Sequence, residues 1–388
     1  MYKVLWLFAL RNVIRRKLQT ILISSMIVLT TALIFCMVGL QTGSDKGMQE
    51  LYTSLFNGDL QVRNSNFEKV EEYDRINQNI ADDYANEVID TTTKSSIASF
   101  VTKRAANFGL ISFNNKSYAV GIVGIEPDLE SKVSKIASSI VKGEFLASEQ
   151  TDGVVIGYAL AEYLGVKLGD EVLYLTQDKD SGMLIEPFVV SGIFNTGMEG
   201  LDKNLTFINL DTFQNLIFYE PLVGNIVIKL QDSSKREQLA KYLKKHLDLH
   251  KVEVLSWKEL FPELQSMMSF NNFINYIYYL VFILLIAFIV LNSMVLSTIR
   301  RMKEFGLLAA IGLPDKNLSY ILIIEVFIIT IVSIIIGSTI GIAITYYYSV
   351  NGFNMHFDDT GSPIKFPTTI YPNLKDIRMV FGPVIIFI

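Results

Sequence analysis

Three long apolar segments constrain this chain more than any other feature. A helix that crosses a bilayer needs about 20 consecutive apolar residues, because each residue rises ~1.5 Å and the hydrocarbon core is ~30 Å thick. Residues 21–40, 273–296 and 318–346 each reach this length, and the one charged residue among them is Glu325. A long and mostly polar segment separates the first apolar segment from the second. This layout predicts a membrane subunit with one large domain outside the lipid.

A fourth apolar run, residues 379–388, has the composition of a span but not the length. We expect it to be the start of a fourth membrane helix that is cut short in the sequence as given. The predicted segments are therefore 1–17 (an amphipathic surface helix), 18–40 (first span), 41–272 (outer domain), 273–298 (second span), 299–317 (short loop), 318–347 (third span), 348–377 (outer loop) and 378–388 (start of the fourth span).

The basic residues predict which side of the membrane each segment occupies. Cytoplasmic flanks of spanning helices carry an excess of Lys and Arg. The residues before the first span include several bases and no acid, namely Lys3, Arg11, Arg15, Arg16 and Lys17. The loop between the second and third spans holds Arg300, Arg301, Lys303 and Lys316. The whole chain nevertheless has a net charge of −5, so the long polar segment is acidic. We expect the N-terminus and the 299–317 loop in the cytoplasm and residues 41–272 outside.

Residues 1–17 have the pattern of a helix that lies along the inner membrane surface. Leu5, Phe8 and Leu10 can share an apolar side, while Arg11, Arg15 and Arg16 would reach lipid headgroups. The alternative is a cleaved signal peptide, but the apolar run that follows is longer than the roughly 7 to 15 residues of a signal core, and no A-x-A site follows it. We therefore expect a permanent anchor.

The outer segment is long enough to bury a core of its own and has a mixed α and β pattern. It contains no cysteine, since the single one of the chain, Cys36, lies in the first span. We expect a β-rich part over about residues 58–200 and an α/β subdomain over about 204–256, with a helix that begins at Ser234 in a capping box with Glu237. The predicted strands are 59–62, 96–101, 117–123, 153–156, 171–175, 188–193, 225–230 and 252–255.

Motifs for catalysis are missing from the sequence. There is no G-x-x-x-x-G-K-[ST] loop to bind nucleotide phosphates and no G-x-S-x-G elbow. His246 and His250 have the spacing of two metal ligands on one helix face, but no further ligand pattern completes a site. We interpret them as an exposed helix end. The sequence predicts no enzyme, no metal, no cofactor in this chain and no nucleic-acid partner.

Two features inside the third span suggest contacts with other helices. Glu325 lies in its cytoplasmic half, where a carboxylate is costly unless it is paired or hydrated. The other spans offer no charged partner, so we expect hydrogen bonds to hydroxyl groups of the first span (Ser24, Ser25, Thr30, Thr31) or to a neighbouring subunit. A mechanical role is the alternative. Gly337 and Gly341 form a small-x-x-x-small pattern, which favours close approach of another helix.

The loop after the second span carries a recognisable motif. Residues 303–312 read KEFGLLAAIG, and an apolar span containing Glu325 follows within a few residues. This segment resembles the R-E-I-G-I-L-R-A-I-G-A signature of FtsX-like permeases, the membrane subunits of MacB-type ABC systems. Residues 58–62 (GDLQV), 124–127 (GIEP) and 153–157 (GVVIG) are similar to that family's outer-domain pattern. Residues 188–196 and 256–260 resemble the lipoprotein-releasing LolC/LolE branch in particular.

The resemblance implies an α-helical transmembrane bundle of four helices plus a large α+β extracytoplasmic domain of the MacB periplasmic core type. It also implies a separate cytoplasmic ABC ATPase dimer, which holds the ATP and Mg, and a second permease that is a copy or a paralogue. In the family the loop after the second span docks on the ATPase, and the residues carried over to that role are Arg300, Arg301, Lys303, Glu304, Phe305 and Gly306. The alternative is a positively charged flank without a docking role.

For the lipoprotein-releasing branch, the resemblance implies a bacterial inner-membrane protein that passes a lipoprotein to a periplasmic carrier. Acyl chains would enter between the first two spans, with Met37, Phe282 and Phe288 as candidates for the lining. The carrier would meet the loop from Thr176 to Pro187, including Asp178 and Met183, which is shorter than the family's hook. The alternatives are a MacB-like efflux or mechanotransmission permease and an FtsX-like regulator of a cell-wall hydrolase that transports nothing.

Overall fold

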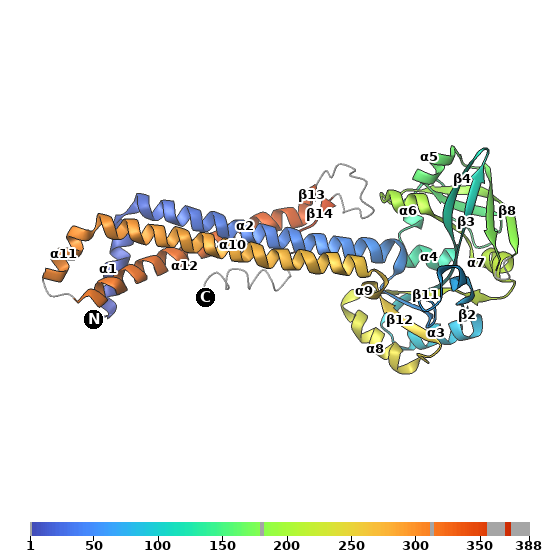
Figure 1. Cartoon of the computed structure of the whole chain (residues 1–388), viewed down its shortest axis with the longest axis horizontal. Helices are drawn as coiled ribbons and strands as arrows, with labels where there is room; N and C mark the ends of the chain where they lie inside the picture. Colours follow the sequence, from blue (N-terminus) through green and yellow to red (C-terminus); the bar gives the residue numbers. More distant parts are fainter. Residues whose placement is uncertain (1, 179–181, 311–313, 355–368, 374–388) are drawn as a thin grey trace. The chain divides into compact units, whose positions relative to one another are not determined.

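The computed structural model describes residues 2–178, 182–310, 314–354 and 369–373. Residues 378–388, where we predicted the start of a fourth span, lie outside the described residues, as does most of the predicted 348–377 loop. Two compact units are present: residues up to Met48 together with those from Ser266 onward form a helical unit, and Gln49–Gln265 form a folded α/β unit. Figure 1 shows the elements of both units.

The helical unit contains the three predicted spans. They fall within α2 (Lys17–Tyr52), α10 (Pro262–Arg300) and α12 (Asp315–Asn351), each long and apolar enough to cross a membrane. Two shorter helices accompany them, α1 (Tyr2–Arg15) and α11 (Met302–Ala310), and two short strands, β13 (Phe353–Asn354) and β14 (Thr369–Ile370), form a hairpin-like pair. Each long helix continues beyond its apolar segment, because the backbone N–H and C=O groups of the polar ends go on forming hydrogen bonds within the helix.

Small residues set the packing of α12 on α2. A Cβ atom added to Gly337 would lie 2.7 Å from the Val28 carbonyl oxygen, so only glycine fits against this stretch of α2. The hydroxyl groups of Ser24 and Ser333 share a hydrogen bond of 2.7 Å across the same interface. Helix α1 packs along α12 as well, with the Trp6 ring edge-on to the Phe327 ring at 6.4 Å. The predicted surface helix therefore exists but lies against the third span.

The α/β unit is built on a ten-stranded sheet in the order β12-β1-β11-β3-β4-β9-β6-β8-β5, with β7 paired to both β3 and β8. Most neighbours are antiparallel, while β4 with β9 and β6 with β8 are parallel. The strands of this sheet are β1 (Leu60–Asn64), β3 (Ala98–Phe113), β4 (Lys116–Ile125), β5 (Ile140–Gly143), β6 (Gly153–Gly157), β7 (Glu171–Gln177), β8 (Met183–Phe194), β9 (Leu205–Asn209), β11 (Asn225–Leu230) and β12 (Val252–Ser256). Strands β2 (Ile80–Ala81) and β10 (Leu222–Val223) form a separate two-stranded sheet.

Helices cover the sheet and close three hydrophobic clusters. They are α3 (Asp82–Lys94), α4 (Pro127–Val133), α5 (Tyr158–Leu164), α6 (Glu199–Asn204), α7 (Leu210–Phe213), α8 (Arg236–His246) and α9 (Trp257–Leu260). The eight predicted strands all overlap observed ones. The chain enters the sheet through Gly58, whose φ of +62° is costly for other residues, so a glycine is needed between the preceding helix and β1.

The predicted division of the outer domain is wrong. Strand β1 pairs with both β11 and β12, so the α/β subdomain that we placed at about 204–256 takes its central strand from the beginning of the domain. Its core joins residues far apart in sequence, including Leu60, Val88 and Leu243. Strand β9 belongs instead to the β-rich part, where it lies between β4 and β6. A local pattern predicts a strand but not its distant partner, and here the partner sets the boundary.

The start of α8 also differs from the prediction. The Asp232 carboxylate caps the short 3₁₀ turn before the helix by accepting a hydrogen bond from the Ser234 backbone N–H, so Ser234 does not cap the helix itself. The capping box in this region is formed by Ser256 and Glu259 at the start of α9. His246 and His250 are exposed, and no group of His, Cys, Asp and Glu among the described residues is arranged to hold a metal ion.

Candidate functional site

Arg301 occupies the break between α10 and α11. Its N–H donates to the Thr298 carbonyl at 3.1 Å, which tightens the last turn of α10, and its own carbonyl accepts from the Phe305 N–H at 2.9 Å in the first turn of α11. The bend turns the Arg301 side chain inward, and only 2% of that side chain is exposed. The neighbouring Arg300 is exposed. One of two adjacent arginines is therefore buried in the helical unit.

The buried guanidinium of Arg301 binds Glu325. The Nη1 atom donates to both carboxylate oxygens, at 2.8 and 2.9 Å, and Asn12 of α1 donates from Nδ2 to the same carboxylate at 2.7 Å. A charge within a membrane helix is tolerated when it is paired and hydrogen-bonded. This cluster therefore removes the cost that makes Glu325 unusual, and it ties together α12, α1 and the α10–α11 junction.

Glu304 extends the cluster to the surface. Its Oε2 accepts from Arg301 Nε at 3.2 Å and from Arg16 Nη2 at 3.4 Å, while 61% of its side chain stays exposed. The Arg301 guanidinium also lies over the Phe305 ring, 4.7 Å from its centre. Helix α11 is thus fastened to the bundle through a chain of charges that begins at the surface and ends at a buried carboxylate.

The predicted hydroxyl partners of Glu325 are wrong, while contact with a neighbouring subunit stays a prediction. Ser24 binds Ser333, and the hydroxyl groups of Ser25, Thr30 and Thr31 donate to carbonyls within their own helix, as membrane-helix hydroxyls often do. Arg16 binds Glu304, and its contact with lipid headgroups stays a prediction. The error about Glu325 has a clear cause. The basic residues were assigned to the membrane surface by their position in sequence, whereas the bend at Arg301 brings one of them inside.

The residues that we carried over as ATPase contacts fall into two groups. The first group is exposed on α11 and at its junction with α10, and it consists of Arg300, Lys303, Glu304 and Gly306. Arg301 is buried and Phe305 is half-buried, so these two hold α11 in place and do not offer themselves to a partner. Docking on an ATPase stays a prediction for the exposed group.

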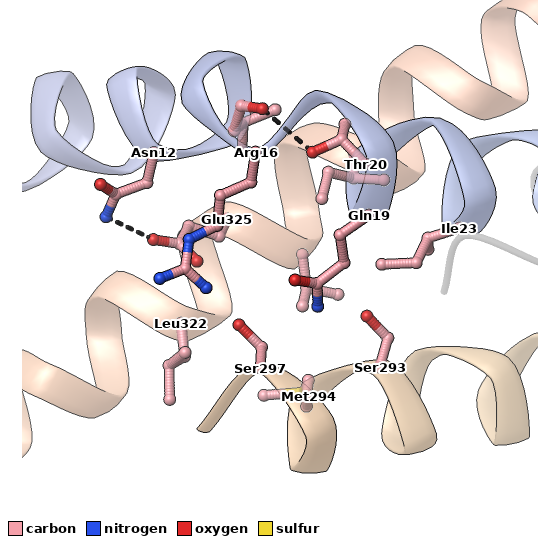
Figure 2. A pocket seen from close by; sticks show the side chains of 13 residues that line it. Asn12, Arg16, Gln19, Thr20, Ile23, Ser293, Met294, Ser297, Leu322 and Glu325 are labelled. Atoms are coloured by element: carbon pink, nitrogen blue, oxygen red, sulfur yellow. Dashed lines mark hydrogen bonds between the residues drawn. The ribbon is translucent and has the colours of Figure 1, made fainter. Parts of the chain in front are cut away.

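A small cavity of about 30 Å³, lined by both polar and apolar side chains, lies beside this cluster. Figure 2 shows the Glu325 and Asn12 side chains on one side of it, with Gln19 of α2 and Ser293 and Ser297 of α10 facing the same space. The two serines are four residues apart and so share one face of α10. The cavity is large enough for one or two water molecules. Hydrogen-bonding groups from all three long helices therefore meet next to the buried carboxylate.

The other predicted membrane residues have different surroundings. A Cβ on Gly341 would lie 2.6 Å from the Phe35 Cβ, so this glycine, like Gly337, lies in tight contact with α2. Phe282 packs against a small cluster on α2 formed by Ile34, Phe35 and Val38, and Met37 is half-buried nearby in sequence. Phe288 is 69% exposed. A lining role for Met37, Phe282 and Phe288 stays a prediction.

The predicted carrier-contact loop is the turn between β7 and β8. Asp178 is held within it, since its carboxylate accepts from the Gly182 N–H at 2.7 Å and from the Tyr219 hydroxyl at 2.8 Å. Met183 is 82% exposed, and Pro187, which lies on the same face of strand β8, is exposed as well. Residues 179–181 at the turn lie outside the described residues. Asp178 therefore orders the base of the hairpin, and Met183 and Pro187 are on its surface.

Met183 and Pro187 belong to a larger exposed apolar face that sequence reasoning missed. The register places Leu110, Leu175 and Ile185 in one row across β3, β7 and β8, and Leu173 and Pro187 in the next row. Outward-facing apolar residues of these strands form what we call the apolar sheet face: Phe108, Leu110, Leu173, Met183, Ile185 and Pro187. Apolar surface that is contiguous and exposed marks sites of interaction more often than single exposed residues do. Each of the three strands carries apolar residues at alternate positions, but these positions can be recognised as one face only when the register of the strands is known.

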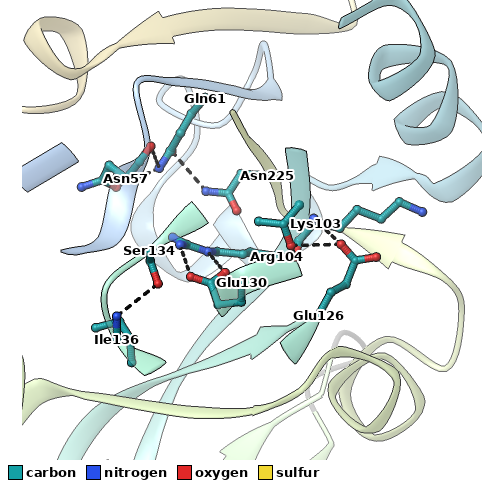
Figure 3. A network of polar contacts seen from close by, with 10 residues as sticks. Asn57, Gln61, Lys103, Arg104, Glu126, Glu130, Ser134, Ile136 and Asn225 are labelled. Atoms are coloured by element: carbon teal, nitrogen blue, oxygen red, sulfur yellow. Dashed lines mark hydrogen bonds and ion pairs between the residues drawn. The ribbon is translucent and has the colours of Figure 1, made fainter. Parts of the chain in front are cut away.

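A buried polar network stabilises the centre of the α/β unit, as Figure 3 shows. Arg104 of β3 donates from Nε and Nη2 to the two carboxylate oxygens of Glu130 in α4, at 2.8 and 2.6 Å, and both side chains are almost fully buried. Beside them, Glu126 accepts from the Lys103 N–H at 2.7 Å. The paired geometry satisfies both charges, so we assign this network a structural role.

The comparisons with known families cover both units. The MacB-like periplasmic core domain matches residues 20–246, and the FtsX-like permease C-terminal domain matches residues 276–388. Together they confirm the resemblance found in the sequence. The crystal structure of the periplasmic region of MacB from Actinobacillus actinomycetemcomitans is 18% identical, covers 57% of this chain and 98% of its own, and has a TM-score of 0.38.

Several relatives are similar to this chain at modest identity. The lipoprotein-releasing system transmembrane protein LolC of Xylella fastidiosa (strain Temecula1) is 25% identical over 229 residues, which is 58% of this chain and 55% of LolC. An ABC transporter permease of Methanocaldococcus jannaschii is 24% identical over 52% of this chain and 50% of its own. LolE of Haemophilus influenzae is 26% identical over 32% of this chain and 31% of its own. The chain spans about half the length of LolC, its first match. With the MacB-like domain matching more than half of its residues and the permease domain following, the chain belongs to the FtsX-like, MacB-type family of ABC transporter permeases.

Proposed function

We propose that this chain is the permease subunit that couples ATP hydrolysis on a separate cytoplasmic ABC ATPase to the release of lipoproteins from a bacterial inner membrane toward a periplasmic carrier. The observation that carries the proposal is the similarity to LolC, which is 25% identical over 229 residues, and to LolE, which is 26% identical over 129 residues. The second permease of the complex is a further copy or a paralogue.

The helical unit supports the coupling part of the proposal. Helix α11 exposes Lys303, Glu304 and Gly306 and is fastened to α12 and α1 through Arg301. A force applied to the exposed face of α11 would therefore reach the third span as well as the second. Removing acyl chains from a bilayer costs about 0.8 kcal/mol per methylene, so release must be driven, and ATP hydrolysis is the source of energy that an ABC permease uses.

The apolar sheet face supports the transfer part. It carries Met183 and Ile185 on β8 beside Phe108 and Leu110 on β3. Methionine and aromatic side chains adapt to apolar partners of varied shape. We assign this face to contact with the carrier or with the acylated end of the lipoprotein. In this proposal the hairpin turn at Asp178 positions the edge of that face.

A reconstituted release assay tests the proposal. The permease complex with its ATPase is placed in proteoliposomes that contain a fluorescent lipoprotein, and release to a soluble lipoprotein carrier is followed on adding ATP. Met183→Asp with Ile185→Asp should reduce transfer while ATP hydrolysis continues. Leu249→Asp, which changes an exposed leucine elsewhere in the α/β unit, is the matched control. If ATP drives no lipoprotein release from the unaltered complex, lipoprotein release is the wrong function.

A MacB-like efflux or mechanotransmission role is the second candidate. The short β7–β8 turn favours it, because Gln177 and Met183 already pair and leave only residues 178–182 for a hook. ATP-dependent export of a small molecule or peptide by the same proteoliposomes, without transfer of lipoprotein, would decide for this candidate.

A further inference from the structure

The Arg301–Glu325 ion pair joins parts of the chain that no continuous helix connects. Arg301 lies at the junction of α10 and α11, Glu325 lies in α12, and Asn12 of α1 donates to the same carboxylate. Displacement of α11 alone would pull the guanidinium away from Glu325. The distance between the Arg301 guanidinium and the Glu325 carboxylate therefore depends on the position of α11 relative to α12.

Separation of this pair requires new partners for both charges. Arg301 and Glu325 are both buried, and an isolated buried charge is far more costly than a paired one. Arg301 keeps Glu304 within reach of its Nε, at 3.2 Å, and Glu304 moves with Arg301 because it lies in the first turn of α11, three residues further along the chain. The guanidinium thus remains paired when α11 moves, and Glu325 is the group that must be accommodated otherwise.

The cavity beside Glu325 provides that accommodation. Gln19, Ser293 and Ser297 line it together with the positively charged Arg16. Within the part of the chain that the structure describes, Gln19 and the two serines make no side-chain hydrogen bond. Each has an N–H or O–H group that can donate to a carboxylate or to a water molecule bound to it. Asn12 also lines the cavity, so its hydrogen bond to Glu325 can persist. A carboxylate that leaves Arg301 would find donors from α2 and α10 on its other side.

We propose that Glu325 and Arg301 form a two-position latch in which Glu325 binds Arg301 in one state and the hydrated cavity of Gln19, Ser293 and Ser297 in the other. The inference rests on the chain being an ABC permease whose α11 is moved by an ATPase. In the first state the ion pair makes α12 move together with α11. In the second state α12 is no longer joined to α11 by this pair. Arg301 and Glu325 are positioning residues, and two discrete arrangements of one buried group provide the bistable element that transmission between distant sites requires.

Spin-label distances in the assembled complex test the latch. Nitroxide labels on Leu307 of α11 and Tyr320 of α12, both exposed, are introduced with Cys36 replaced by serine. In the otherwise unaltered chain the distance distribution should have two resolved populations whose ratio shifts on trapping the ATPase with ATP and vanadate. Arg301→Gln should abolish the first population. Gln19→Leu combined with Ser297→Ala should deplete the second.

Controls separate the latch from general packing and from the proposed function. Ser24→Ala with Ser333→Ala removes a hydrogen bond between α2 and α12 that does not involve α11, and it should leave both populations in place. A single unchanging population in the unaltered complex, in the presence of nucleotide-dependent ATP hydrolysis, would overturn the latch and leave the transport function standing. The latch would also be overturned if the Arg301→Gln variant kept both populations. Failure of the unaltered chain to assemble with any ABC ATPase would instead refute the proposed function.

Discussion

Gly341 of α12 lies directly against Phe35 of α2, and a Cβ on the glycine would be 2.6 Å from the phenylalanine Cβ. Replacing Gly341 with leucine forces the two helices apart, and overpacking of this kind costs about 1–3 kcal/mol. We expect Gly341→Leu to lower the stability of the helical unit in detergent, measured as the SDS concentration at which it unfolds. Ala343→Leu, on an exposed face of α12, is the control. Equal effects of the two changes would show that the contact does not hold the helices together.

The Arg104–Glu130 pair should contribute strongly to the stability of the α/β unit. Glu130→Gln removes the carboxylate charge opposite a buried guanidinium, and breaking a buried ion pair in this way costs about 3–5 kcal/mol. Urea unfolding followed by fluorescence of the buried Trp257 measures the effect. Glu68→Gln acts on a carboxylate that is 54% exposed and pairs with both Arg75 and Arg63, where a loss of about 1 kcal/mol or less per pair is expected. The structural role assigned to the buried pair would be untenable if both variants unfolded at the same urea concentration.

Local patterns in the sequence were sufficient for the elements that depend on neighbours in sequence. Long apolar runs predicted α2, α10 and α12, and alternation predicted strands such as β6 and β11. These predictions worked because the buried faces of a helix or strand determine the spacing of apolar residues along the sequence. The glycine spacing at 337 and 341 likewise indicated close helix contact, since small side chains at one helix face have few other uses in a membrane.

Contacts between distant parts of the chain were not predictable in this way. Arg300 and Arg301 are chemically identical and adjacent, yet only the second is buried, because the helix break at Arg301 decides which one turns inward. The pairing of β1 with β11 and β12 is similar, since nothing near Leu60 identifies strands far along the chain as its neighbours. The apolar sheet face follows the same rule, because it exists only once three strands are aligned.

Asp59 should make the stability of the α/β unit sensitive to acid. Burial alone would raise the pKa of this carboxyl, but Arg236, the Leu230 N–H, the Lys229 charge and Ser233 together hold the pKa below its usual value. A carboxyl with a lowered folded pKa contributes stability above its unfolded pKa of about 3.9, and that contribution is lost as the pH falls through the lower folded value. We expect the unfolding temperature to fall in this range.

Asp59→Asn tests this origin of acid sensitivity. The variant should be less stable than the unaltered protein at neutral pH, because Arg236 loses its buried partner at 2.8 Å, and the two should converge as the pH falls below about 4. Thermal unfolding measured at a series of pH values provides the comparison. Asp90→Asn removes an exposed carboxylate from α3 and should reproduce the unaltered profile. A constant difference between Asp59→Asn and the unaltered protein at every pH would contradict the role of the ionised carboxylate.

Glu304→Lys should separate ATP hydrolysis from transport. The Glu304 carboxylate accepts from both Arg16 and Arg301, so a lysine there would face two positive charges and detach α11 from the bundle without disturbing the apolar spans. We expect normal membrane insertion and continued ATP hydrolysis, with at least a tenfold loss of substrate released per ATP in proteoliposomes. Glu263→Lys makes the same charge change at the other end of α10, where the side chain is exposed, and should keep the ratio unchanged. An unaltered ratio in Glu304→Lys would mean that force reaches the bundle through the α10 backbone alone, and the charged cluster would then serve only to bury Glu325.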